Sequence, residues 1–149
     1  MKKILFVCTG NTCRSPIAQG LFQKMVGYNH EYEVASAGLH AVQGLAASSL
    51  SLAVLAEQGI DFSLFRSQPV TSSLIEQATH VFTMTQGHLR ELIRLYPQHQ
   101  KKFSLLNEGI TTNDISDPIG GILETYQECC ETIQRALDNI LTLLHHNTI

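Results

Sequence analysis

The sequence has few charged residues and no long apolar run. Charged side chains make up 15% of its 149 residues, whereas about 25% is usual for a soluble domain. A formal charge of −3 indicates neither a basic nucleic-acid surface nor an acidic tail. The longest apolar runs, at 4–8 and 52–56, are five residues long, against about 20 for a membrane-spanning helix. These absences exclude a membrane-spanning protein and argue against a nucleic-acid-binding one.

A secretion signal and a metal site are missing as well. The apolar stretch at the start is shorter than the roughly 7 to 15 residues of a signal peptide, so we expect a cytoplasmic protein with reduced thiols. Of the four cysteines, Cys129 and Cys130 are adjacent and on a helix would point about 100° apart, so they cannot form the second ligand pair of a zinc site. They are predicted to be core and surface positions of the last helix. No metal and no other cofactor is expected.

What remains is the pattern of a single α/β domain over residues 1–149. A chain of this length can bury about two thirds of its unfolded surface around one core. Strands alternating with helices indicate a parallel sheet joined by right-handed crossovers. The predicted strands are 3–7, 31–36, 80–84 and 102–106, and the predicted helices are 15–27, 45–58, 72–79, 86–96 and a long one from 122.

The segment from Cys8 to Ser15, directly after the first predicted strand, reads Cys-Thr-Gly-Asn-Thr-Cys-Arg-Ser. Ligands of open α/β sheets bind beyond the carboxyl ends of the strands. Gly10 and Asn11 tolerate left-handed backbone, so this loop can turn its N–H groups inward and form an anion nest. The following helix, predicted to be capped by Ser15, adds its positive end, and Arg14 can grip two oxygens of a tetrahedral oxyanion.

A thiol beneath such an anion is predicted to be a nucleophile. An ordinary cysteine is only about 3% thiolate at pH 7, but inward N–H groups, Arg14 and the Ser15 hydroxyl would stabilise a negative sulfur. Cys8 is then poised to attack phosphorus. The alternative is a core cysteine beside a surface arginine, yet Gly, Arg and Ser at these spacings coincide by chance only about three times in ten thousand. A nucleotide-binding Gly-x-x-x-x-Gly-Lys loop fails, because no Gly-Lys follows Gly10.

The loop resembles that of low-molecular-weight protein tyrosine phosphatases, whose mark is Cys-x-Gly-Asn-x-Cys-Arg-Ser directly after the first strand. The resemblance covers essentially the whole chain, through Ser36-Ala37-Gly38 and Asp117-Pro118. It implies a three-layer domain with a four-stranded parallel sheet flanked by helices, a cysteinyl-phosphate intermediate and no metal. It also implies phosphorylated proteins as substrates, and we expect a monomer.

Residues 107–121 form a long irregular segment that contains two candidates for a proton donor. A positioned acid is typically worth about 10² to 10⁴ in rate. Asp117 precedes Pro118, which favours an extended backbone, although Asp-Pro alone more often marks a turn. The resemblance makes Asp117 the general acid, which then activates the hydrolytic water, and leaves Asp114 as a solvated loop residue.

The same resemblance assigns supporting roles. It implies that Asn11 braces the loop through a hydrogen bond to Ser36 and that Ser15 supports the thiolate. Cys13 matches the second loop cysteine, which either forms a reversible disulfide with Cys8 or simply packs in place. The predicted phosphate loop and its support comprise Thr9, Gly10, Asn11, Thr12, Cys13, Ser15 and Ser36.

Three departures bear on loop support and substrate. Leu64 stands where many members have a bracing histidine, and Ile119 stands where tyrosine-specific members carry an aromatic that sandwiches the phenyl ring. Thr12 matches a bacterial branch resembling protein-arginine phosphatases, although that branch usually has an aromatic at Ile119. A hydroxyl can accept a hydrogen bond from a guanidinium. Thr12 and Ile119 are therefore predicted to set specificity, for phosphoarginine first and phosphotyrosine close behind.

Two functions are alternatives to a phosphatase, and the first of them is found in proteins with the same fold and loop. Thiol-dependent arsenate reductases relay electrons through cysteines after the third strand, and residues 83–95 contain none. An inactive phosphate-binding module would be expected to lack Cys8, Arg14 or Asp117, and all three are present.

Overall fold

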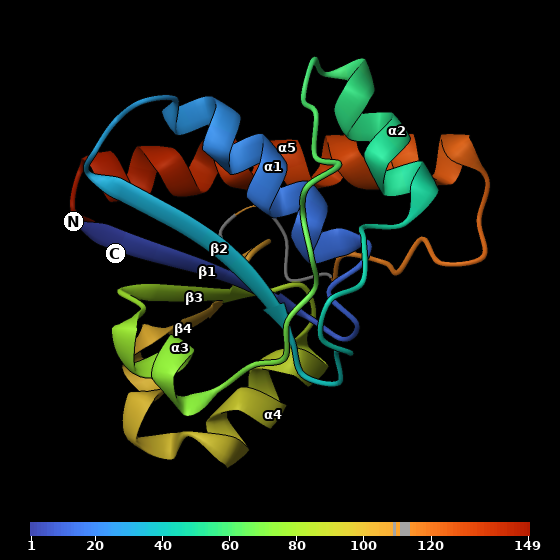
Figure 1. Ribbon diagram of the computed structural model, residues 1–149. Helices are drawn as coiled ribbons and strands as arrows, with labels where there is room; N and C mark the ends of the chain where they lie inside the picture. The colour runs from blue at the N-terminus through green and yellow to red at the C-terminus, as the bar shows by residue number, and fades with distance from the viewer. Residues whose placement is uncertain (109, 111–113) are drawn as a thin grey trace.

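The computed structural model describes residues 1–108, 110 and 114–149. Its centre is a four-stranded parallel sheet with the strand order β2-β1-β3-β4 (Figure 1), which confirms the predicted fold class. The described elements are β1 (Lys2–Cys8), α1 (Arg14–Val26), β2 (Tyr32–Gly38), α2 (Ser49–Glu57), α3 (Ser72–Gln77), β3 (His80–Thr83), α4 (Gln86–Leu95), the 3-10 helix η1 (Pro97–Lys102), β4 (Phe103–Leu105) and α5 (Leu123–His145).

Helices cover both faces of the sheet. Successive side chains of a strand point to opposite faces, so Ile4 and Phe6 of β1 pack with residues of α1 and α5. Leu5 and Val7 pack on the other face with residues of α3 and α4. Figure 1 shows α1, α2 and α5 on one side of the sheet and α3 and α4 on the other. Burial on both faces explains why residues 4–8 of β1 form an uninterrupted apolar run.

The helix predicted at 45–58 begins later, at Ser49. Ser67 holds the preceding backbone outside the helix, because its hydroxyl donates to the carbonyl of Val42 and accepts from the N–H of Leu45. Ser48 then caps α2 by accepting the N–H of Ser51. The predicted start at residue 45 was wrong. The apolar Leu45 fits the spacing of the helix that follows, but its backbone N–H is bound by Ser67 and not within a helix.

The carboxyl ends of the strands meet at one edge of the sheet, where β1 ends at Cys8 and β2 ends at Gly38. A Cβ on Gly38 would lie 2.5 Å from the carbonyl oxygen of Thr9 and 2.9 Å from the nitrogen of Asn11. Only glycine permits this approach without displacing backbone. The end of β2 is thereby pressed against the loop that follows β1.

The adjacent cysteines of α5 are both buried, at 8% exposure for Cys129 and 5% for Cys130. The predicted surface position was wrong, because Cys130 packs in the same core cluster as Val54 and Leu55 of α2. Burial raises the pKa of Cys129 to about 12, so this thiol stays protonated at neutral pH. Within the described ranges, no helix has the length and apolar character to cross a membrane.

Candidate active site

The loop between β1 and α1 closes around the thiol of Cys8, which is 3% exposed. The backbone N–H of Asn11 donates to Sγ at 3.3 Å, and the Ser15 hydroxyl lies 2.8 Å from Sγ. Asn11 has a φ of 57°, whereas Gly10 is not among the residues with a positive φ. The left-handed turn that points an N–H at the sulfur is therefore made by Asn11.

The side-chain amide of Asn11 binds two hydroxyls beside the sulfur. Its Nδ2 donates to the hydroxyls of Ser15 at 2.8 Å and Ser36 at 3.0 Å, so the predicted contact with Ser36 is present. The Ser15 oxygen accepts from Asn11, and the hydroxyl can still donate its own hydrogen to a Cys8 thiolate. The predicted cap role of Ser15 was wrong for the same reason: α1 begins at Arg14, and the Ser15 hydroxyl serves the sulfur.

Two glutamines that sequence reasoning missed complete this support. The backbone N–H of Gln68 donates to Oδ1 of Asn11 at 3.0 Å, and Oε1 of Gln19 accepts from the Ser36 hydroxyl at 2.6 Å. Leu64 is 90% exposed and lies outside the network, so the residue at the family's histidine position does not brace the loop. Gln68 is 57 positions from Asn11, and no pattern in the sequence indicated that contact.

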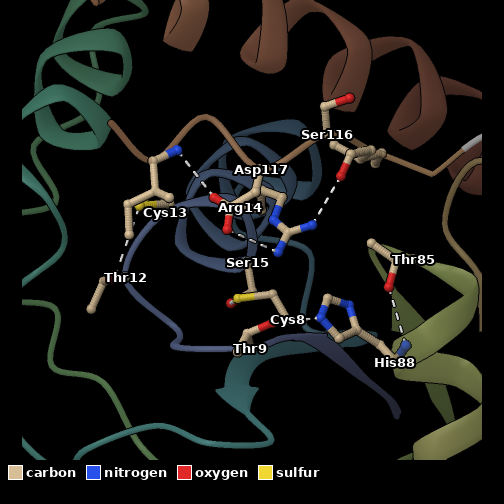
Figure 2. Close-up of polar contacts among 12 residues, drawn as sticks. Cys8, Thr9, Thr12, Cys13, Arg14, Ser15, Thr85, His88, Ser116 and Asp117 are labelled. Carbon is tan, nitrogen blue, oxygen red and sulfur yellow. Dashed lines mark hydrogen bonds and ion pairs between the residues drawn. The ribbon is translucent and has the colours of Figure 1, made fainter. Parts of the chain in front are cut away.

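Arg14 joins the loop to the segment that carries Asp117. Its Nη1 donates to the carbonyl of Ile115 at 2.9 Å, and Nη2 lies 3.6 Å from Oδ2 of Asp117. The Arg14 side chain is 6% exposed and that of Asp117 is 44% exposed. Oδ1 of Asp117 accepts the N–H of Ile119 at 3.1 Å. Figure 2 shows the carboxylate of Asp117 directed at the guanidinium of Arg14.

A thiol, a guanidinium and a carboxylate thus converge at the amino end of α1, whose dipole adds positive potential there. This combination suits transfer of a phosphoryl group to sulfur, with the guanidinium on the phosphoryl oxygens and the carboxyl group on the leaving atom. Over the part of the chain that the structure describes, no group of three or more His, Cys, Asp or Glu side chains could hold a metal ion.

Comparison with known proteins identifies the family of the chain. The sequence pattern of the low molecular weight phosphotyrosine protein phosphatases matches residues 3–148. The chain belongs to this family. It is 38% identical over 142 residues to a protein-arginine-phosphatase of Geobacillus stearothermophilus, covering 93% of each chain. It is 37% identical over 139 residues to a probable low molecular weight protein-tyrosine-phosphatase of Ralstonia nicotianae, covering 93% of this chain and 92% of the relative.

Solved structures agree with this phosphatase assignment. The YwlE arginine phosphatase from Geobacillus stearothermophilus superposes with a TM-score of 0.92 at 36% identity, covering 99% of this chain and 95% of that one. A likeness of this extent carries the three-layer fold over to the present chain.

The mouth of the phosphatase loop is bound to α4 through a histidine that sequence reasoning missed. The Thr9 hydroxyl lies 2.8 Å from Nε2 of His88, which is 8% exposed. Among the described residues no partner exists for its Nδ1. Burial, and next the positive charge of Arg14, lower the pKa of His88 to about 4. The imidazole is therefore neutral at neutral pH and adds no positive charge to the site.

The second loop cysteine of the phosphatase contacts α5 and the cap of α2. Sγ of Cys13 lies 3.5 Å from the hydroxyl of Tyr126 and 3.5 Å from that of Ser48. Burial raises the pKa of Tyr126, so its hydroxyl stays protonated. Both Cys13 and Cys8 are free thiols, and a reversible disulfide between them stays a prediction.

The two predicted specificity residues differ in burial. Thr12 is half-buried, and its Oγ1 lies 3.9 Å from Sγ of Cys13. Ile119 is 69% exposed, and its backbone N–H donates to Oδ1 of Asp117. Their influence on substrate choice stays a prediction.

Proposed function

We propose that this member of the family is a protein phosphatase that transfers a phosphoryl group from a protein side chain to Cys8 and then to water. One observation carries the proposal. Sγ of Cys8 lies within hydrogen-bonding reach of the Asn11 N–H and the Ser15 hydroxyl, in a loop that ends on the buried Arg14. Both groups favour a negatively charged sulfur, which is the nucleophilic form.

The reaction has two steps. Sγ attacks phosphorus, the bond from phosphorus to the leaving oxygen or nitrogen breaks, and Asp117 gives its proton to that atom. A water then attacks the phosphocysteine while Asp117 takes a proton from it. Inorganic phosphate leaves, and the Cys8 thiolate and the Asp117 carboxylic acid are restored. Asp117 is suited to both steps because its carboxylate lies 3.6 Å from Arg14, the residue that would hold the phosphoryl oxygens.

Arg14 would stabilise the transition state together with the inward N–H groups. Its bond to the carbonyl of Ile115 fixes the plane of the guanidinium before the substrate binds, so little reorganisation is required when charge develops on the phosphoryl oxygens. The mild overall charge of −3 is no obstacle, since one arginine and a ring of N–H groups concentrate the positive potential in a single loop.

Phosphoarginine is the first proposed substrate and phosphotyrosine the second. The Thr12 hydroxyl can accept a hydrogen bond from a guanidinium, and Ile119 offers no aromatic face to a phenyl ring. Relatives named as protein-arginine-phosphatases support the first substrate, and relatives named as protein-tyrosine-phosphatases support the second. The proposed setting is the cytoplasm, and the proposed active form is the monomer.

Phosphate release from matched phosphoarginine, phosphotyrosine and phosphoserine peptides by one preparation tests this function. We expect turnover of the first two and little of the third. Release from none of them, with Cys8 intact, would leave the chain a binding module.

The Thr12→Ile variant tests the choice between the two substrates. We expect the ratio of kcat/KM for phosphoarginine over phosphotyrosine to fall about tenfold, the worth of one hydrogen bond. An unchanged ratio removes Thr12 as the determinant.

A further inference from the structure

The first turn of α4 contacts both halves of the site. On one side Nε2 of His88 is 2.8 Å from the hydroxyl of Thr9 in the phosphate loop. On the other side the backbone N–H of Gln86 donates to Oδ1 of Asp114 at 2.8 Å. Figure 2 shows the His88 ring at the edge of the site, with α4 behind it. This turn is therefore a common support for the two catalytic segments.

The contact with Asp114 follows from how a helix begins. The first N–H groups of a helix have no partner within it, and α4 satisfies one of them with its own cap, the Thr85 hydroxyl, which accepts from His88 at 3.1 Å. Gln86 is the first residue of α4, and its N–H is bound by a side chain 28 positions away. A carboxylate at this end also interacts favourably with the helix dipole. Asp114 is exposed, as predicted, but its side chain is bound.

Asp114 begins the short run that ends at Asp117. Within that run the N–H of Ile115 donates to the carbonyl of Met84 at 2.9 Å, and the carbonyl of Ile115 accepts from Arg14 at 2.9 Å. The run is thus fixed by α4, by the end of β3 and by Arg14. The side chain of Asp114 makes the anchor to α4, whereas the backbone of Ile115 makes the other two.

We infer that Asp114 is a positioning residue for the general acid Asp117, acting through its hydrogen bond to the first turn of α4. The inference rests on the proposed function, because it takes Asp117 as the proton donor. A misplacement of about 1 Å can cost about 10²-fold in rate. Since two backbone anchors remain when Asp114 is truncated, we expect a loss of about three- to tenfold.

The experiment compares two aryl phosphates that differ in their need for a proton. Phenyl phosphate releases a poor leaving group and needs the acid, whereas 2,4-dinitrophenyl phosphate releases a good one and does not. For Asp114→Ala we expect kcat/KM to fall about three- to tenfold with phenyl phosphate and less than about twofold with the dinitrophenyl ester. Asp114→Asn keeps an acceptor oxygen for the Gln86 N–H and is expected to restore the phenyl phosphate rate.

Asp61→Ala is the matched control. Asp61 is another exposed aspartate whose Oδ1 accepts a backbone N–H, from Ser63 at 3.0 Å, but on a loop that takes no part in the site. We expect it to leave both esters unaffected. An equal loss with both esters in Asp114→Ala, or no rescue by Asp114→Asn, would overturn the positioning role.

Asp117→Asn separates failure of this inference from failure of the proposed function. If Asp117→Asn shows the large, leaving-group-dependent loss and Asp114→Ala shows none, only the positioning role is wrong. If Asp117→Asn loses no more with phenyl phosphate than with the dinitrophenyl ester, the acid assignment fails and the inference fails with it.

Discussion

Residues 8–15 are largely buried and bound from several elements, whereas the end of the acid-bearing segment lies at the surface. Cys8 and Arg14 are 3% and 5% exposed. In the other segment the Asp117 side chain is 44% exposed, and that of Ile119 is 69% exposed. The proposed function places the phosphoryl group in the first region and the rest of the substrate side chain beside the second. Burial is thus greatest at the residues that are proposed to bind the phosphoryl group, whichever side chain carries it.

Two glycines, Gly38 packed against residues 8–15 and Gly120 in the acid-bearing segment, give the largest expected contrast. Gly38→Ala places a Cβ 2.5 Å from the Thr9 carbonyl oxygen, and because that oxygen belongs to the backbone, the phosphate loop itself must move to relieve the overlap. We expect kcat/KM for an aryl phosphate to fall about 10²-fold or more and the free energy of unfolding to fall by about 2 to 4 kcal/mol.

Gly120→Ala is the counterpart in the acid-bearing segment. Its φ is +79° and nothing lies within 4 Å of the added Cβ, so the cost is backbone strain of about 1 to 2 kcal/mol at an exposed site. Steady-state kinetics and urea unfolding of both variants test the contrast. Equal losses of activity would show that the two regions are equally constrained.

Removal of the Ser15 hydroxyl should have the next largest effect. Ser15→Ala deletes the group that lies 2.8 Å from the Cys8 sulfur, and hydrogen bonds to charged groups are worth about 1.5 to 3 kcal/mol, so kcat/KM should fall about ten- to a hundredfold. Ile119→Ala, which deletes an exposed side chain beside Asp117, should change the same rate only about threefold or less. A larger loss from Ile119→Ala with a small aryl phosphate would contradict the comparison.

The last expected effect concerns the pH dependence of stability through His88. Its pKa falls from 6.5 to about 4 on folding, so between these values the unfolded chain binds a proton that the folded chain does not. The contribution is fully present above pH 6.5 and is lost as the pH falls towards 4. With allowance for solvent screening, we expect a loss of about 1 to 2 kcal/mol.

Urea unfolding at pH 7.5 and pH 5 measures this loss, and His88→Gln, whose amide can still reach Thr9, should reduce the difference between the two pH values. An unchanged difference in the variant would mean that His88 does not contribute. The histidine links the two regions through α4, so this measurement also reports on that support.

Much of the fold could be predicted because its signals are local. The apolar run of β1 and the spacing of apolar residues along α5 indicate their elements without tertiary information. The loop from Cys8 to Ser15 is equally local, since eight consecutive residues carry the nucleophile, the cation and the turn. The main part of the site could be predicted because its residues are consecutive in the sequence.

The rest of the site could not be predicted because it depends on contacts between distant positions. Gln68 is 57 residues from Asn11, and His88 is 79 residues from Thr9. No local sequence pattern around Gln68 or His88 indicates that these residues support the phosphate loop. The departure at Leu64 did not indicate how the loop is supported. The side chain of Asn11 is bound by the backbone N–H of residue 68, which any residue there except proline could provide.

Trapping of the covalent intermediate tests the central claim most directly. The enzyme is mixed with 2,4-dinitrophenyl phosphate, quenched in denaturant within milliseconds and fragmented by mass spectrometry. The account predicts one phosphoryl group on Cys8 and none on Cys13, Cys129 or Cys130, at a level that rises in Asp117→Asn because hydrolysis of the phosphocysteine is slowed. Turnover with no phosphoryl group on Cys8, or full turnover by Cys8→Ser, would contradict the account.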